Sequence, residues 1–242
     1  MTHKRQALVT GANKGLGLAI SKGLASAGLS VWMGGRDRSR GEDAVQVLRA
    51  EGLDVRFIQI DVADDASVRR AAGTVGQEID ALGVLVNNAG IVLDQASRPS
   101  ELSMDEIKAT YEVNLFGPIR VTQAFAPLLK AADDARIVNM SSSLGSLTLI
   151  TDPTSLSSTI NFLAYSSSKV ALNAVTVSFA KEFEPFGIKV NSVEPGNVRT
   201  DLNGNTGSLT PERGAETAIK MALIDKDGPT GSFFGNYGRQ PW

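Results

Sequence analysis

The chain has 242 residues, of which 42% are hydrophobic and 21% are charged, a composition that excludes disordered and fibrous proteins. Its formal net charge of -2 offers no basic surface to a phosphate backbone, so we expect no nucleic-acid partner. There is no cysteine, and the single histidine, His3, stands beside the N-terminus. Disulfides, thiolate metal sites and mechanisms built on histidine or cysteine are therefore excluded, and we expect no metal.

The first residues pass from a polar segment at 1–5 directly into an apolar one at 7–10, which leaves no room for a signal sequence. No later apolar run approaches the length of a membrane span. We therefore expect a soluble, cytoplasmic protein with no membrane partner.

Apolar strand patterns alternate with amphipathic helix patterns along the whole chain. Strands are predicted at residues 7–10, 29–33, 55–60, 84–86, 136–139, 188–193 and 231–235. Helices are predicted at 18–28, at 38–51 with Asp37 as cap, at 65–79, at 104–129 with a bend at Pro118, from before Tyr165 to about 185, and at 211–223. Such alternation indicates parallel strands joined by crossover helices, so we expect one α/β domain over residues 1–242, with helices on both faces of about seven parallel strands.

A glycine-rich turn at residues 11–17 joins the first strand to the first helix. Glycines at this place allow a sharp turn and a close approach to a pyrophosphate, and the N–H groups at the helix start favour an anion. A tight turn without any ligand is the alternative. The candidate cofactor-binding residues of the turn are Gly11, Asn13, Lys14, Gly15, Leu16 and Gly17.

The end of the second strand should decide which dinucleotide is bound. An acidic residue there selects NAD(H), whereas a cation suits the additional phosphate of NADP(H). Gly35 takes the place of the acid and Arg36 is free for a bidentate phosphate contact, with Lys14 as a second cation on the same side. We expect NADPH/NADP+ rather than NAD(H), although Asp37 becomes the ribose ligand if the strand ends one or two residues later.

Two further segments follow strands at the edge where ligands bind in open α/β sheets. Asp61 and Val62 are predicted at the adenine edge, and Asn88, Ala89 and Gly90 near the adenosine-side ribose. Ordinary turn chemistry is the alternative for the asparagines.

Tyr165 and Lys169 are four residues apart on a predicted helix, so they share one face. The ammonium should favour the phenolate and lower the pKa of Tyr165, which makes tyrosine usable as an acid or base. An ordinary surface pair is the alternative. The other motifs favour the first interpretation.

Taken together, these motifs resemble the short-chain dehydrogenase/reductase family from about residue 4 to residue 242, and the resemblance implies a single-domain, doubly wound Rossmann fold. The motifs are, in chain order, residues 10–17, 87–90, Asn114, Ser142, Tyr165 with Lys169, and Pro195-Gly196. Residues 13–14, 34–37, 40–41 and 210–217 are most similar to the NADPH-dependent carbonyl reductases of that family.

The resemblance implies a role for each motif residue. Tyr165 would donate a proton to the substrate oxygen in reduction and accept one in alcohol oxidation. Lys169 would also hold the nicotinamide-side ribose, and Asn114 would position a water that links Lys169 to solvent. Ser142, preferred to Ser141 and Ser143 because Gly145 follows three residues later, would bind the carbonyl oxygen. The segment that would close over the nicotinamide contains Pro195, Gly196, Val198 and Thr200.

Twenty-two residues separate Ser142 from Tyr165, more than is common in the family. The insertion at about 146–162 would either cover a face that relatives use to pair subunits or wall the substrate pocket, so monomer and homo-oligomer both stay open. Residues 201–209 are expected to form a small, mobile lid. We expect an enzyme that reduces a ketone or aldehyde with NADPH; the alternatives are a dehydrogenase working mainly in the alcohol-oxidising direction and a non-catalytic NADP(H)-sensing protein.

Overall fold

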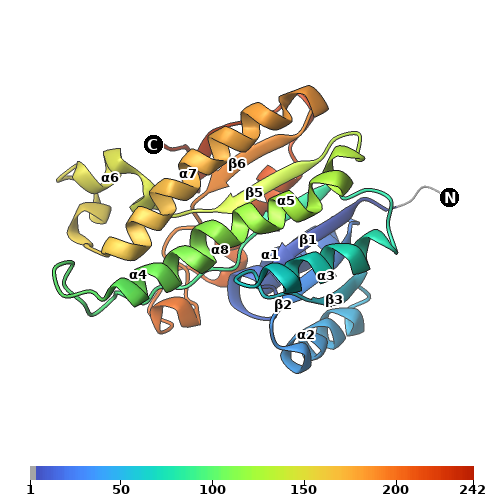
Figure 1. Ribbon diagram of the computed structural model, residues 1–242, viewed down its shortest axis with the longest axis horizontal. Helices are drawn as coiled ribbons and strands as arrows, with labels where there is room; N and C mark the ends of the chain where they lie inside the picture. The colour runs from blue at the N-terminus through green and yellow to red at the C-terminus, as the bar shows by residue number, and fades with distance from the viewer. Residues whose placement is uncertain (1–3) are drawn as a thin grey trace.

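The computed structural model describes residues 4–242 and contains, within them, an eight-stranded sheet of order β3-β2-β1-β4-β5-β6-β7-β8 (Figure 1). The strands are β1 (Gln6–Thr10), β2 (Ser30–Gly35), β3 (Val55–Gln59), β4 (Val84–Asn87), β5 (Arg136–Met140), β6 (Lys189–Val193), β7 (Ser232–Gly235) and β8 (Gly238–Arg239). The helices are α1 (Gly15–Ser26), α2 (Arg38–Ala50), α3 (Asp65–Gly76), α4 (Met104–Tyr111), α5 (Gly117–Lys130), α6 (Leu147–Thr151), α7 (Leu163–Phe183) and α8 (Pro211–Ala222). His3 lies outside the described residues.

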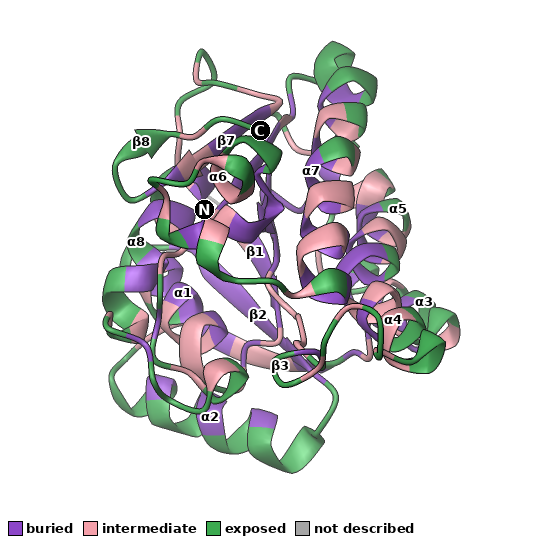
Figure 2. Cartoon of the chain, turned by 90° about the vertical axis from the view of Figure 1, so that its left-hand side faces the viewer, coloured by how far each residue is buried: buried purple, intermediate pink, exposed green. Residues whose placement is uncertain are grey.

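Each face of the sheet is covered by a layer of helices, as Figure 2 shows. Ala7 and Val9 pack into a core with α1, α2 and α8, whereas Leu8 between them packs into the core with α3, α5 and α7. Successive side chains of a strand point to opposite faces, so a strand buried on both faces must be apolar throughout. This explains why short, continuous apolar runs predicted the strands.

The predicted α/β architecture is confirmed, with three differences in detail. The sheet gains β8, a two-residue strand that pairs antiparallel with β7. The first helix begins at Gly15, inside the glycine turn. The bend in the helical region at 104–129 is a π-helical turn over Glu112–Phe116, and Pro118 follows it in the first turn of α5, where a missing N–H is tolerated.

The insertion at 146–162 is more ordered than its weak sequence pattern indicates. It contains α6 and a 3-10 turn over Leu156–Thr159. The side chains of Ser146 and Ser155 cap these two short elements by accepting N–H groups of Leu149 and Ser157. Figure 1 places α6 at one end of the molecule, beside the start of α7. No helix within residues 4–242 has both the length and the apolar character of a membrane span.

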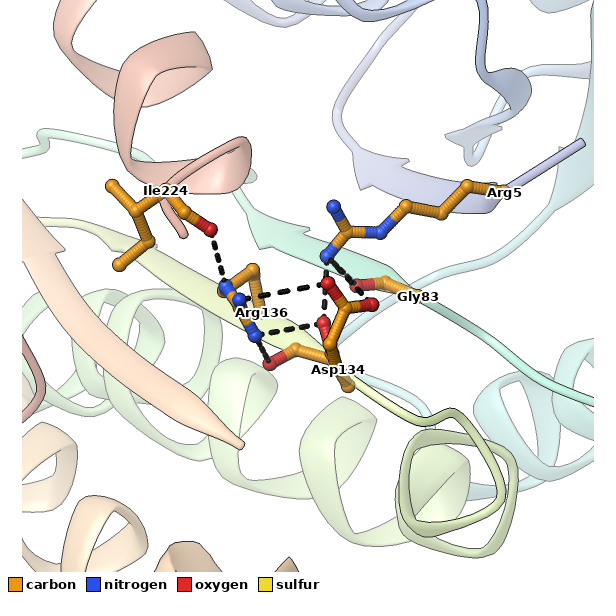
Figure 3. Close-up of polar contacts among 6 residues, drawn as sticks. Arg5, Gly83, Asp134, Arg136 and Ile224 are labelled. Atoms are coloured by element: carbon orange, nitrogen blue, oxygen red, sulfur yellow. Dashed lines mark hydrogen bonds and ion pairs between the residues drawn. The ribbon is translucent and has the colours of Figure 1, made fainter. Parts of the chain in front are cut away.

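Two arginines fasten the amino ends of the central strands (Figure 3). The Arg136 side chain is fully buried and donates to Ile224 O at 2.9 Å, Asp134 O at 2.7 Å and Ala135 O at 2.9 Å. Arg5 donates to Asp134 O at 2.7 Å and to Gly83 O at 3.1 Å. Both guanidinium groups also face the Asp134 carboxylate, at 3.7 Å from Arg5 and 3.6 Å from Arg136. We call Arg5, Asp134 and Arg136 the arginine brace. It lies at the end of the sheet opposite to the one where ligands bind in such folds.

We expect Arg136→Ala to lower the free energy of unfolding by about 2 kcal/mol, because it leaves buried carbonyl groups without donors. Denaturant unfolding measures the change. Arg213→Ala is the matched control: Arg213 is exposed and, among residues 4–242, its side chain pairs with Glu216 alone, so the expected loss is below about 1 kcal/mol. Equal losses of unfolding free energy in the two variants would contradict a stabilising role for the arginine brace.

Candidate active site

The strand order places the topological switch point of the sheet between β1 and β4, whose neighbours lie on opposite sides. In open α/β sheets the crevice for ligands lies beyond the carboxyl ends of the strands at such a point. The glycine turn follows β1 and residues 87–90 follow β4, so the structure brings these two predicted segments together.

The glycine turn has the geometry of an anion cradle. Gly11 and Gly15 have φ values of +63° and +52°, which favour glycine. A Cβ on Gly17 would lie 2.3 Å from Gly11 O, so a side chain cannot be accommodated there. Among the described residues, no side chain caps the N-terminus of α1 at Lys14. The first N–H groups of α1 therefore remain available to a bound phosphate.

Hydrogen bonds across the switch point connect the two segments. The Asn88 side chain donates to Thr10 O at 2.9 Å and Gly11 O at 3.2 Å. Thr10 Oγ1 accepts the N–H groups of Asn88 and Ala89 at 3.0 and 3.1 Å. The side chain of Asn88 thus holds the turn in shape, and sequence reasoning missed Thr10 as its partner.

The two cations that were predicted to share one phosphate have different surroundings in the structure. Arg36 is exposed and lines a cavity of about 270 Å³ together with Gln59, Asp61, Asp64, Ser67 and Arg70. Lys14 does not line this cavity; its Nζ atom is bonded to Asp201 at 2.6 Å. That Lys14 and Arg36 converge on one phosphate therefore stays a prediction.

The predicted cap at Asp37 is confirmed, since its carboxylate accepts the Arg40 N–H at 3.1 Å at the start of α2. Strand β2 ends at Gly35, in register with Gln59 of β3. Arg36 is thus the first residue after the strand. Asp37, engaged as a cap, is not the acid at the strand end.

Asp61 and Val62 lie just after β3, as predicted. Asp61 lines the cavity with Arg36, and its carboxylate accepts the Ala63 N–H at 3.0 Å. Val62 is buried, and its carbonyl oxygen accepts a hydrogen bond from Arg120 at 2.6 Å. Arg120 also pairs with Asp65 and Glu112, so it fastens this loop to the π-helical turn.

Asn114 is fully buried within the π-helical turn. Its amide accepts from Ile91 N and donates to Ile91 O, both at 2.8 Å, and donates to Ser168 Oγ at 3.2 Å. A Cβ on Gly90 would lie 3.4 Å from Asn114 Oδ1 and 3.7 Å from Lys169 Nζ. Asn114 and Lys169 therefore both lie next to Gly90, and π-helical turns are frequent at functional sites.

Of the three consecutive serines, Ser142 is the one whose hydroxyl faces the Tyr165 side chain and lowers its pKa. Ser141 is buried, and its hydroxyl lies 3.0 Å from where a Cβ on Gly145 would be. The same Cβ would lie 2.9 Å from Lys169 Cβ. Gly145 is therefore required for the close packing of α7 against the turn that carries Ser142.

Tyr165 and Lys169 are both buried on α7, and Lys169 Nζ lies 5.5 Å from the centre of the Tyr165 ring. Nζ donates to Met140 O at 2.7 Å. Burial lowers the pKa of Lys169 to about 8. Burial also raises the pKa of Tyr165 to about 12; the hydrogen bond with Ser142 opposes this shift, and the charges of Asp94 and Glu194 add to it.

The expected lowering of the Tyr165 pKa by Lys169 is therefore not found. Desolvation outweighs the neighbouring cation, because a buried phenolate loses its hydration. The site holds tyrosine in its protonated form. Sequence reasoning missed this, since spacing reports which residues are neighbours but not how much water reaches them.

The segment after β6 lies over the glycine turn. Thr200 Cγ2 is 3.4 Å from where a Cβ on Gly15 would be, and Gly196 has a φ of +79°. Leu202 O accepts a hydrogen bond from Gln95 at 2.7 Å, and Asp201 holds Lys14. The predicted lid at 201–209 is thus fastened from two sides. The predicted residues of this segment are Pro195, Gly196, Val198 and Thr200, of which Val198 is buried.

Comparison with known proteins gives consistent results. A family model described as short chain dehydrogenase matches residues 5–209. The chain is 37% identical to (+)-neomenthol dehydrogenase of Arabidopsis thaliana, over 95% of each chain, and 32% identical to carbonyl reductase [NADPH] 1 of Rattus norvegicus, over 98% of each. A crystal structure of NADPH-bound carbonyl reductase from chicken fatty liver superposes with a TM-score of 0.87 at 28% identity, covering 99% of this chain and 100% of that one.

Proposed function

The chain belongs to the short-chain dehydrogenase/reductase family of oxidoreductases, and from this premise we propose that it reduces a ketone or an aldehyde to an alcohol with NADPH. The observation that carries the proposal is the cluster of the buried Tyr165 and Lys169 with the partly buried Ser142 beside the switch point. Its phenol is protonated and has a hydroxyl partner, as a proton donor to a carbonyl oxygen requires.

The residues of the crevice fit a phosphorylated dinucleotide. The uncapped start of α1 and the glycines of the turn suit a pyrophosphate, and Arg36 stands in the cavity beside Asp61. Two relatives are NADPH carbonyl reductases by name. When bound, the nicotinamide supplies the hydride that adds to the carbonyl carbon.

Side chains of the protein then bind and protonate the carbonyl oxygen. Ser142 donates a hydrogen bond to this oxygen and stabilises the charge that develops on it. Tyr165 transfers its proton to the same oxygen, which completes the alcohol. Lys169 and Asn114 both lie next to Gly90, and we assign to them the return of a proton from solvent to Tyr165 through a water.

The reductive direction is supported by the state of Tyr165. Alcohol oxidation needs the phenolate, whereas burial raises the pKa of Tyr165 to about 12 and keeps the phenol protonated at neutral pH. A protein that only senses NADP(H) has no need of a buried proton donor with a serine partner. Reduction is therefore the direction that a protonated Tyr165 favours.

The segments around Tyr165 expose apolar side chains, which favours an apolar carbonyl substrate. They come from the loop after β4, from the insertion and the start of α7, and from the segment over the glycine turn. The exposed residues are Leu93, Leu147, Leu156, Ile160, Leu163 and Leu202. We propose that the insertion at 146–162 walls the substrate side of the single domain and does not mainly serve subunit pairing.

A panel of ketones and aldehydes, graded from polar to apolar, tests the proposal when NADPH oxidation is followed by absorbance. We expect turnover of apolar members with NADPH and slower turnover with NADH. Tight NADPH binding without oxidation by any member of the panel would instead favour the sensing protein.

Arg36→Ala tests the assignment of the cofactor phosphate. We expect KM for NADPH to rise about tenfold, because a charge-assisted contact is lost, while KM for NADH stays the same. Arg98→Ala removes the same charge from an exposed position in the loop after β4 and should change neither value. Equal KM values for NADPH in wild type and Arg36→Ala would show that another residue selects the cofactor.

A further inference from the structure

The helix that carries the reacting tyrosine lacks a cap of its own. The residue before α7 is Phe162, whose side chain cannot accept a hydrogen bond. The first N–H groups of α7 are instead bound by Asp94, from the loop after β4. Asp94 Oδ2 accepts the N–H of Ala164 at 2.7 Å and that of Tyr165 itself at 3.3 Å.

This cap differs from the others in the described part of the chain. Helices α2, α3, α4 and α8 are capped by the residue directly before them. Asp94 is 70 residues away from Ala164 in sequence and only 1% exposed. Its Oδ1 atom is buried without a partner among the described residues. A buried carboxylate with one unpaired oxygen is unfavourable for stability, and a serine at position 162 would serve the helix as well.

Building on the proposed function, we propose that Asp94 is a positioning residue for the reaction: its carboxylate completes the N-terminus of α7 and so fixes Tyr165 beside Ser142. The hydrogen bond to the Tyr165 N–H acts on the backbone of the reacting residue. The negative charge is also favoured at the positive end of the helix dipole. Asp94 thereby connects the loop after β4, which carries Asn88 and Gly90, to the position of the phenol.

The same carboxylate affects the protonation of the phenol. In the described part of the chain, the charged groups that face Tyr165 are Asp94 from the loop after β4, Glu194 from the segment after β6 and Lys169 one helical turn along. Asp94 raises the pKa of Tyr165 by charge repulsion, as Glu194 does, after the larger effect of burial. Loss of the Asp94 charge must therefore lower this pKa.

Asp94→Asn and Asp94→Ala separate the two effects. The asparagine retains an oxygen that can accept the two N–H groups but removes the charge. Reduction requires the phenol and falls as pH rises through its pKa, so the alkaline limb of reduction should move to lower pH in Asp94→Asn. Alcohol oxidation requires the phenolate, so its rise with pH should also begin at lower pH.

Asp94→Ala removes the cap as well, and misplacement of the reacting group should lower kcat for reduction about 10- to 100-fold. We expect KM for NADPH to stay the same, because the glycine turn is not involved. Hydrogen exchange of the first turn of α7 should be faster than in wild type, whereas Asp94→Asn should retain most of the protection and most of kcat. Asp105→Asn, an exposed acid in the first turn of α4, is the control and should change none of these values.

Equal losses of kcat in Asp94→Asn and Asp94→Ala, without any movement of the pH limbs, would overturn the proposal, as would wild-type exchange and turnover in both. If the wild type reduces no carbonyl compound, the proposed function fails instead. Two readouts then still test Asp94 in the cofactor-free protein: hydrogen exchange of α7, and absorbance titration of tyrosine with Tyr165→Phe as the reference.

Discussion

Tyr165→Phe is expected to lower kcat for carbonyl reduction by about 10²- to 10⁴-fold, the range that a positioned general acid contributes. The ring remains, so the buried packing of α7 is preserved, and only the hydroxyl that donates the proton is lost. Binding of NADPH, measured by fluorescence, should be close to that of wild type. Single-turnover measurement of hydride transfer would place the loss in the chemical step.

Tyr237→Phe is the matched control, since Tyr237 lies in the turn between β7 and β8 and is 99% exposed. We expect its turnover to equal that of wild type. If Tyr165→Phe kept near-normal turnover on an accepted substrate, another group would have to donate the proton, and the proposed mechanism would be wrong.

The sequence predicted those parts of the site that depend on local chemistry. Gly11, Gly15 and Gly17 stand where positive φ or close backbone contact requires glycine, and Asp37 caps α2 as its place before a helix indicates. Ser142 was selected through Gly145, and the packing of Gly145 against α7 gives a physical reason for that spacing.

Contacts between distant segments could not be predicted in the same way. Asp94 caps α7 across 70 residues, and the only sequence signal was indirect: the helix begins after Phe162, which cannot cap it. Lys14 was assigned to a phosphate although Asp201 holds it in the structure. Such pairings depend on how loops meet at the sheet edge, which periodicity does not report.

The burial of side chains was the other quantity that the sequence did not report. The spacing of Tyr165 and Lys169 predicted a lower pKa for the phenol, but desolvation acts on both groups and raises the pKa of Tyr165. The positive charge of a bound, oxidised nicotinamide would lower this pKa as a separate contribution. The pair is therefore prepared to donate a proton, and acceptance of one requires a further positive charge.

Lys169→Met is expected to abolish reduction. At neutral pH it should also raise the free energy of unfolding, because it removes a buried charge. Burial lowers the pKa of Lys169 from 10.5 to about 8, so the folded protein holds this charge at a cost of about 3 kcal/mol. The methionine fills similar space without a charge. Part of the gain is offset, because Met140 O loses the hydrogen bond that Lys169 donates to it.

The dependence on pH separates these two contributions. Below pH 8 the lysine is charged in both the folded and the unfolded chain, and the full penalty applies. Between pH 8 and 10.5 the unfolded chain keeps a proton that the folded protein has lost, so wild-type stability rises with pH. The stability of Lys169→Met relative to wild type should therefore fall by about 3 kcal/mol from pH 7 to pH 10.5 in denaturant unfolding.

Lys181→Met, an exposed position on the same helix, is the control, and its difference from wild type should stay constant over this range. Parallel pH profiles for wild type and Lys169→Met would contradict the depressed pKa. Suppose that Lys169→Met loses turnover and that its free energy of unfolding, relative to wild type, is highest at neutral pH. This result would show that the protein keeps the buried ammonium although it lowers the stability of the fold. Such a trade-off is expected of a residue retained for chemistry, because burial of a charge favours folding only when a partner compensates it.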